Sequence, residues 1–257
     1  MQASAVRLLQ ITDTHLRSDP AWRQHGVEPR RRYAAVLAYL HEHAAGIDGL
    51  LVTGDISHDE GAVYGGVRAD LEALGRPALV LPGNHDVPAA FAEAFPAAGA
   101  VAFTRERRLG GWRLLALDTQ LPGAVHGRVG EAQLAWLARA LEAAPRTPTL
   151  VVLHHQPAPV GTAWIDASGL ADGPALCALL EGHPQVRAAV FGHVHQAVDR
   201  RTAGGLRLLA APATSVQFRA GSAQKAFEAG PPGVRWLACE PQGELASWVA
   251  RLPLERA

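Results

Sequence analysis

Short runs of apolar residues recur along this chain, separated by turn residues or by longer amphipathic segments. The runs have the length of β-strands and stay apolar throughout, which is typical of strands buried on both faces of a sheet. They occupy residues 6–12, 49–55, 77–86, 112–119, 149–157, 186–195, 205–215 and 233–252. Helical segments fall between them at residues 30–46, 67–75 and 131–144. The pattern therefore predicts an α/β protein in which helices cover sheets.

The last apolar runs have little helical sequence between them, so we expect the C-terminal part to be more antiparallel. Neither a linker nor a short-period repeat interrupts the chain. We therefore predict one domain over residues 1–257, a two-sheet α/β sandwich whose mixed sheets are flanked by helices. In this prediction the C-terminal strands, at about 206–252, complete the second sheet.

Charge and composition narrow the classes of partner. The 257 residues contain 24 Lys plus Arg and 24 Asp plus Glu, so no excess of positive charge favours a nucleic-acid partner. The two cysteines, Cys177 and Cys239, are too few for a disulfide framework. No stretch reaches the roughly 18 apolar residues of a membrane span, and the first residues run into a strand without a signal-peptide core. We expect a cytoplasmic protein without a membrane partner.

Polar residues able to bind metal stand at the C-terminal ends of five strands. They are Asp13 and His15 in DTH, Asp55 in GD, Asn84 and His85 in GNHD, His154 and His155 in HH, and His193 and His195 in GHVH. Ligands of open α/β sheets bind in the crevice outside the carboxyl ends of the strands. Each group alone has an ordinary explanation, such as a cap or a turn. Their joint occurrence predicts a single site.

The residue types suit a pair of metal ions. Carboxylate oxygen, imidazole nitrogen and amide oxygen suit manganese, iron or zinc, and a carboxylate such as Asp55 can bridge two ions. Two metals roughly 3.5–4 Å apart clamp both oxygens of an in-line displacement and lower the pKa of a bound water. Glycines before Asp55, Asn84 and His193 leave room for tight backbone turns. We expect Mn²⁺ and/or Fe²⁺/Fe³⁺, with Zn²⁺ as the alternative.

The five blocks together resemble those of the calcineurin-like metallophosphoesterases, and they extend from Asp13 to His195. The resemblance implies that one metal is bound by Asp13, His15, Asp55 and His195, and the other by Asp55, Asn84, His154 and His193. It implies that His85 is a non-ligand histidine that contacts the substrate phosphate. Asp55, Asn84 and His85 are then the catalytic residues, and Asn84, His85 and His195 contact the substrate.

Three further segments are similar to a narrower group, the bacterial class III 3',5'-cyclic-nucleotide phosphodiesterases. They are PVGTAWID (159–166), LLAAPATSVQF (208–218) and PPGVRWLACEPQGELASWV (231–249). The resemblance implies that a metal-bound hydroxide opens cAMP to the 5'-monophosphate. His85 would stabilise the developing charge or protonate the leaving 3'-oxygen. We expect residues 159–166 and 212–218 to border the substrate.

Other functions share some of these features. A broader phosphodiesterase acting on glycerophosphodiesters or 2',3'-cyclic nucleotides would use the same ligands, as would a phosphomonoesterase. A nuclease would need a basic groove, which the balanced charge disfavours. A protein-binding platform without activity would have lost ligands, whereas all are filled here. A homodimer is left open.

The remaining candidates receive simpler interpretations. We interpret His155 as supporting a neighbouring ligand rather than binding metal. Trp164 and Phe218 are either core aromatics or platforms for a purine. Asp86 and Asp118 are interpreted as residues that order loops, and residues 30–32, three arginines, as a solvated helix face. Ordinary roles are assigned to His25, His41, His43, His58, His126 and His183.

Overall fold

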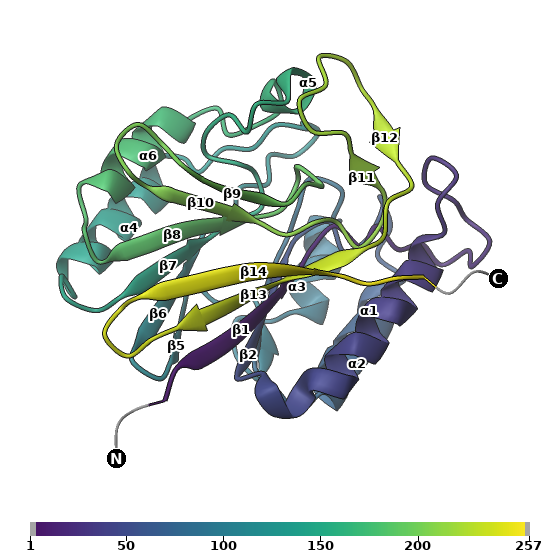
Figure 1. Ribbon diagram of the computed structural model, residues 1–257, viewed down its shortest axis with the longest axis horizontal. Coiled ribbons are helices and arrows are strands. Elements are labelled where there is room, and N and C mark those ends of the chain that lie inside the picture. Colours follow the sequence, from purple (N-terminus) through teal and green to yellow (C-terminus); the bar gives the residue numbers. More distant parts are fainter. Residues whose placement is uncertain (1–3, 255–257) are drawn as a thin grey trace.

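Two six-stranded sheets form the centre of the structure, a computed structural model that describes residues 4–254 (Figure 1). The first sheet contains, in spatial order, β14 (Leu245–Arg251), β13 (Gly233–Cys239), β1 (Val6–Ile11), β2 (Gly49–Thr53), β3 (Ala78–Leu81) and β4 (Val101–Ala102). The second contains β5 (Glu106–Leu109), β6 (Trp112–Ala116), β7 (Thr149–Val152), β8 (Val186–Phe191), β10 (Arg207–Ala210) and β9 (Val198–Arg201). A separate antiparallel pair is formed by β11 (Gln217–Phe218) and β12 (Phe227–Glu228).

Both sheets are mixed, as the sequence predicts. Strands β1 to β4 are parallel, and so are β6, β7, β8 and β10. The antiparallel strands lie at the edges, where β13 and β14 flank β1, and where β5 and β9 end the second sheet. The strands expected over about 206–252 do not all enter one sheet. Of the strands in this range, β10 pairs with β8 in the second sheet, whereas β13 pairs with β1 in the first sheet and β14 pairs with β13.

Helices cover the outer face of each sheet (Figure 1). The first sheet is covered by α1 (Pro29–His43), which continues into the 3-10 turn η1 (Ala44–Gly46), and by α2 (Tyr64–Ala73) and α3 (Pro88–Ala94). The second is covered by α4 (Glu131–Glu142) and α6 (Gly173–Glu181), with the short α5 (Ala163–Asp166) packed near its strand ends. The layers are therefore helix, sheet, sheet, helix.

Three apolar cores explain why the strands read as continuous apolar runs. Leu8 and Leu51 point into the core between the two sheets, whereas Leu9 and Leu50 point toward the helices of the first sheet. All four side chains are at most 1% exposed. Successive residues of a strand face opposite sides of a sheet. Where both sides are covered, all of them are buried, so the strand does not alternate between apolar and polar residues. Each such side chain contributes about 1.5–3 kcal/mol by its burial.

Helix α1 departs from the solvated arginine face that its sequence suggests. Arg32 is only 5% exposed, and its guanidinium donates to the carbonyls of Ser215 at 2.9 Å, Ala229 at 2.8 Å and Gly230 at 2.6 Å. Burial lowers the pKa of this guanidinium from its ordinary value. The segments on either side of the β11–β12 pair cover this face of the helix, so Arg32 fastens that pair to the first layer.

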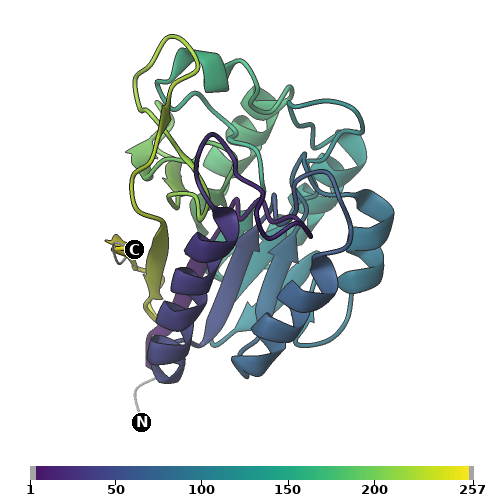
Figure 2. The ribbon, with the colours of Figure 1, turned by 90° about the vertical axis from the view of Figure 1, so that its right-hand side faces the viewer.

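The parallel strands of both sheets end at the same edge of the molecule. Their following loops gather there, above the carboxyl ends of the strands (Figure 2). This edge is the crevice in which the polar strand-end residues are expected to meet. Among the helices described, none is both long and apolar enough to cross a membrane.

Candidate active site

Side chains from the five strand ends come within contact distance of one another. Asp55 Oδ2 lies 3.5 Å from His15 Nε2 and also 3.5 Å from His154 Nε2. His195 Nε2 lies 3.3 Å from Asp13 Oδ1, and His154 Nε2 lies 3.3 Å from Asn84 Oδ1. One oxygen of Asp55 thus stands between histidines that the sequence assigns to different ions. This is the position that a bridging carboxylate needs.

The backbone is strained where these side chains leave it. Positive φ angles, between 44° and 65°, occur at five candidate ligands: Asp13, His15, Asp55, His193 and His195. Residues other than glycine seldom adopt this left-handed region, and such strain gathers at functional sites. The conformation turns each side chain back over its strand end, which lets residues from two sheets share one space.

Two glycines make the close approach possible. A Cβ at Gly83 would overlap Asp55 Oδ1 and the ring of His154. A Cβ at Gly192 would collide with Thr12 Oγ1 and lie 2.7 Å from the Thr53 carbonyl oxygen. These neighbours are buried and belong to other strand ends, so neither can move away. The expectation that glycines provide close turns beneath the site is confirmed at both positions.

Hydrogen bonds fix the orientation of two candidate ligand histidines. His154 donates Nδ1–H to the Thr53 carbonyl at 2.7 Å, and His195 donates Nδ1–H to the Val216 carbonyl at 2.7 Å. Since Nδ1 of each ring is engaged by a carbonyl, Nε2 is the nitrogen that faces the other site residues. Metal-binding histidines are held in this way by a partner on the second nitrogen.

A buried nitrogen without a partner supports metal binding more directly. Nε2 of His193 is inaccessible to solvent and has no hydrogen-bond partner among the described residues. Burial lowers the pKa of this imidazole to about 3, so the ring is neutral at pH 7 and offers a free lone pair. Orphaned buried polar atoms are rare and call for an explanation. The donor set and this atom fit a pair of metal ions, while the assignment of each residue to one ion stays a prediction.

Charge at the centre of the site is shared between Asp55 and His154. Burial would raise the pKa of Asp55, but His154 and His15 beside it hold that pKa well below its usual range. Burial would lower the pKa of His154, yet the Asp55 carboxylate raises it to about 9. Burial keeps the pKa of His15 well below its ordinary value. In the metal-free protein His154 therefore carries the proton that neutralises Asp55.

Neighbouring residues hold the loops in place. His155 donates Nε2–H to the Val125 carbonyl at 3.0 Å and receives the Thr119 hydroxyl hydrogen at Nδ1 at 2.8 Å. Both of its nitrogens are thus engaged, which agrees with a supporting role. The carboxylate of Asp86 accepts hydrogen bonds from the backbone N–H groups of Ser57 at 3.0 Å and Gly83 at 2.8 Å. It ties the loop after β2 to the loop after β3, as expected.

His85 lies at the edge of the site and is joined by two residues that the sequence interpretation missed. Its Nδ1–H donates to Asp59 Oδ1 at 2.9 Å, which leaves Nε2 as the nitrogen available to a substrate. The ring of His58 stacks on that of His85, with centroids 4.4 Å apart. The signal that could have found them is their position in GDISHD: His58 and Asp59 come three and four residues after Asp55, so both had to lie on the loop that Asp55 begins.

A pocket of about 270 Å³ opens over these residues. Aromatic side chains form part of its wall: Phe218 stacks on His195 at 3.9 Å, and Phe227 stacks on His25 at 3.7 Å. Trp164 lies 4.7 Å from Phe218. Of the two segments expected to border the substrate, 159–166 contributes Trp164 and Ile165 to the lining, and 212–218 contributes Phe218.

The fold and this arrangement of side chains define a class of protein. Residues 6–197 match the model of the calcineurin-like phosphoesterase family, and the chain belongs to that family. Among solved structures, a dimetal phosphatase from Danio rerio is similar with a TM-score of 0.65 at 14% identity, covering 98% of this chain and 100% of that one. A purple acid phosphatase from yellow lupin gives a TM-score of 0.67 at 14% identity, with 97% of this chain and 52% of that one covered.

More similar sequences are found among bacterial enzymes. The 3',5'-cyclic adenosine monophosphate phosphodiesterase CpdA of Escherichia coli K12 is 37% identical over 248 residues, which is 96% of this chain and 90% of that protein. The protein of the same name from Pseudomonas aeruginosa is 36% identical over 251 residues, covering 97% of this chain and 91% of that protein. The predicted family resemblance is thereby confirmed.

Proposed function

We propose that this protein is a dinuclear-metal phosphodiesterase that hydrolyses 3',5'-cyclic nucleotides, cAMP first among them, to 5'-monophosphates. The observation that carries the proposal is the meeting of strand-end residues from both sheets around Asp55, beneath a pocket with an aromatic wall. The full-length similarity to enzymes named for cAMP hydrolysis supports the choice of substrate.

The proposed ligands are Asp13, His15, Asp55 and His195 for one ion, and Asp55, Asn84, His154 and His193 for the other. When bound, two such ions supply an activated water and offset the charge that builds on the phosphoryl oxygens. Oxygen and nitrogen donors without thiolate suit Mn²⁺ and Fe²⁺/Fe³⁺, with Zn²⁺ as the alternative.

The chain's own groups orient the substrate and handle its proton. Asp59 holds His85 by accepting the hydrogen on Nδ1, so in the doubly protonated ring the other hydrogen, on Nε2, can be donated to the phosphate or transferred to the leaving 3'-oxygen. Asn84, next to His85 on the same turn, is proposed to contact both an ion and a phosphoryl oxygen. The aromatic wall of Trp164, Phe218 and Phe227 is proposed to take the base of the nucleotide.

The test is a substrate panel with purified protein loaded with manganese. We expect hydrolysis of 3',5'-cAMP and of bis-p-nitrophenyl phosphate, and little hydrolysis of p-nitrophenyl phosphate. Turnover of 2',3'-cAMP at an equal or higher rate would favour the broader phosphodiesterase. Turnover of p-nitrophenyl phosphate alone would show a phosphomonoesterase and refute the proposal. Homodimerisation and a cytoplasmic location stay predictions.

A further inference from the structure

His15 differs from the other two oriented histidines in the partner of its Nδ1 atom. His154 and His195 each donate to a backbone carbonyl. In His15 the corresponding atom lies 2.9 Å from Nδ1 of another imidazole, His58. A carbonyl can only accept, so it fixes the tautomer of its partner without further help. A ring nitrogen either donates or accepts, so its own state has to be set.

The surroundings of His58 set that state. If His15 binds metal through Nε2, its hydrogen is on Nδ1, and His58 must accept at Nδ1 and carry its own hydrogen on Nε2. The nearest carboxylate oxygen, Asp59 Oδ2, lies 3.9 Å from His58 Nε2 and favours a hydrogen on that atom. The same Asp59 accepts the hydrogen bond from His85. The Asp59 carboxylate thus favours one tautomer in each ring: the one with hydrogen on Nε2 in His58, and the one with hydrogen on Nδ1 in His85.

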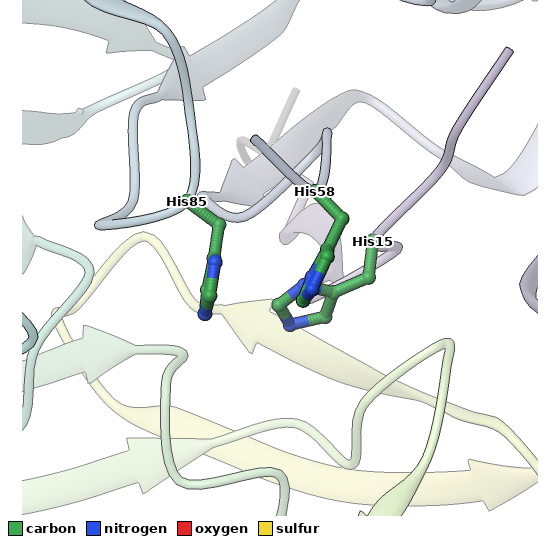
Figure 3. Close-up of side chains that lie close together, drawn as sticks. All are labelled: His15, His58 and His85. Atoms are coloured by element: carbon green, nitrogen blue, oxygen red, sulfur yellow. The ribbon is translucent and has the colours of Figure 1, made fainter. Parts of the chain in front are cut away.

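Stacking holds the ring of His58 in place. The three imidazoles project from separate loops into one space (Figure 3). His58 stacks on His85 with ring planes 16° apart, and Trp22 packs against His58 with centroids 4.8 Å apart. The guanidinium of Arg17 lies 5.7 Å from the centroid of the Trp22 ring. His58 therefore presents an edge to His15 and a face to His85.

We propose that His58 is a positioning residue for both parts of the active site. Its Nδ1 accepts the hydrogen of His15 and so directs His15 Nε2 to a metal ion. Its ring face supports His85 at the substrate. The inference rests on the ligand role of His15 in the proposed function. It predicts that the acceptor atom of His58 contributes to metal binding, whereas its ring contributes to turnover.

Two substitutions separate the contributions. In His58→Asn the amide Oδ1 takes about the place of Nδ1, so the acceptor is kept and the ring is lost. In His58→Phe the ring is kept and the acceptor is lost. Removing the partner of a ligand histidine typically weakens metal binding about 10- to 100-fold. We expect His58→Phe to raise one of the two Mn²⁺ dissociation constants by that factor, and His58→Asn to leave both near wild-type values.

The binding measurement does not depend on catalysis. Metal-free protein is titrated with Mn²⁺ against a chelating dye, and stoichiometry is checked by mass spectrometry of the metal. His183→Phe removes an imidazole far from the site, at the end of α6, and serves as the control. Circular dichroism of the metal-free variants reports folding. If His58→Phe does not fold, His58→Leu, which also lacks an acceptor, is measured in its place.

Measurement of cAMP turnover tests the contribution of the His58 ring. At saturating Mn²⁺ we expect His58→Phe to recover a kcat near wild type, and His58→Asn to have a lowered kcat with its metals in place. Wild-type metal affinity in the variants without an acceptor, or equal weakening in His58→Asn, would overturn the inference. Should wild-type protein bind two ions without hydrolysing cAMP, the proposed substrate would be wrong and this inference would stand.

Discussion

Backbone strain and burial of polar side chains fall on the same residues in this site. Asp13, Asp55 and His193 have left-handed backbones, and each such residue costs about 1–3 kcal/mol unless its surroundings impose it. They are also almost completely buried. Such residues cluster at functional sites, and here the bound ions would offset both the strain and the burial of polar groups.

Asp55 is the residue proposed to bind both ions. Because one of its oxygens lies 3.5 Å from a histidine of each proposed group, Asp55→Ala should remove both metals and nearly all activity. Metal content after dialysis measures the first effect and cAMP hydrolysis the second. Two full equivalents of metal in this variant would contradict the bridging role.

His85 separates catalysis from metal binding. It is proposed to touch the substrate and not an ion, so His85→Ala should keep both metals and lower kcat on cAMP by about 10²- to 10⁴-fold, the range for a lost general acid. The loss should be smaller for bis-p-nitrophenyl phosphate, whose leaving group hardly needs a proton. Equal losses on both substrates would assign His85 to phosphate stabilisation.

The proton on His154 predicts a pH dependence of metal binding. With a pKa of about 9 in the metal-free protein, the ring is charged at pH 7 and must lose its proton to bind metal. Binding of the one ion that His154 is proposed to hold should release a proton at pH 7, and the affinity for that ion should rise by about tenfold per pH unit up to about pH 9. Calorimetry in buffers of different ionisation enthalpy counts the protons. A count of zero at pH 7 would refute the assignment.

At the scale of elements, the β11–β12 pair forms one wall of the pocket. It carries Phe218 and Phe227, and Arg32 of α1 binds the carbonyls on either side of it. A segment with so little hydrogen bonding of its own depends on this attachment. The buried arginine thus links a helix of the first layer to the aromatic wall of the pocket.

Phe227 tests whether this wall binds the base. Stacking of a base on an aromatic ring contributes about 1–3 kcal/mol, so Phe227→Ala should raise KM for cAMP by about 5- to 150-fold. Because the ring packs on His25, Trp164 and Phe218 and not on a proposed ligand, kcat and metal content should stay near wild type. Phe227→Tyr, which keeps the stacking face, is the matched control. An unchanged KM in the alanine variant would place the base elsewhere.

At the scale of the whole molecule, the site joins the two sheets. Asp13, Asp55 and Asn84 follow strands of the first sheet, whereas His154 and His193 follow strands of the second. Ions held by both groups would cross-link the sheets at the edge where their loops meet. The core between the sheets supplies the remaining attachment.

Removal of metal should therefore lower the melting temperature. An ion at about 100 times its dissociation constant stabilises a protein by about 2.7 kcal/mol, which corresponds to about 5–10 °C in Tm for a chain of this size. Differential scanning calorimetry with and without a chelator measures the shift. Asp55→Ala should show none. A wild-type Tm that the chelator leaves unchanged would contradict the cross-link.

The local pattern determined most of the elements and the candidate ligands. Strands buried on both faces must be apolar throughout, so their positions are readable, and the polar residues that end them stand out because burial makes them costly. Asp13, Asp55 and His193 were identified on this basis. The antiparallel character of the last strands followed from the scarcity of helix between them.

Tertiary structure alone decided the rest. The pairing of β13 with β1 joins distant parts of the chain, and nothing local distinguishes it from pairing in the other sheet. Arg32 reads as a surface residue until the segments around β11 and β12 cover it. His58 has no ligand spacing, and its value depends on which rings the folded loops bring to its edge and its face. Contacts between loops are made by geometry that neither hydrophobic pattern nor residue spacing encodes.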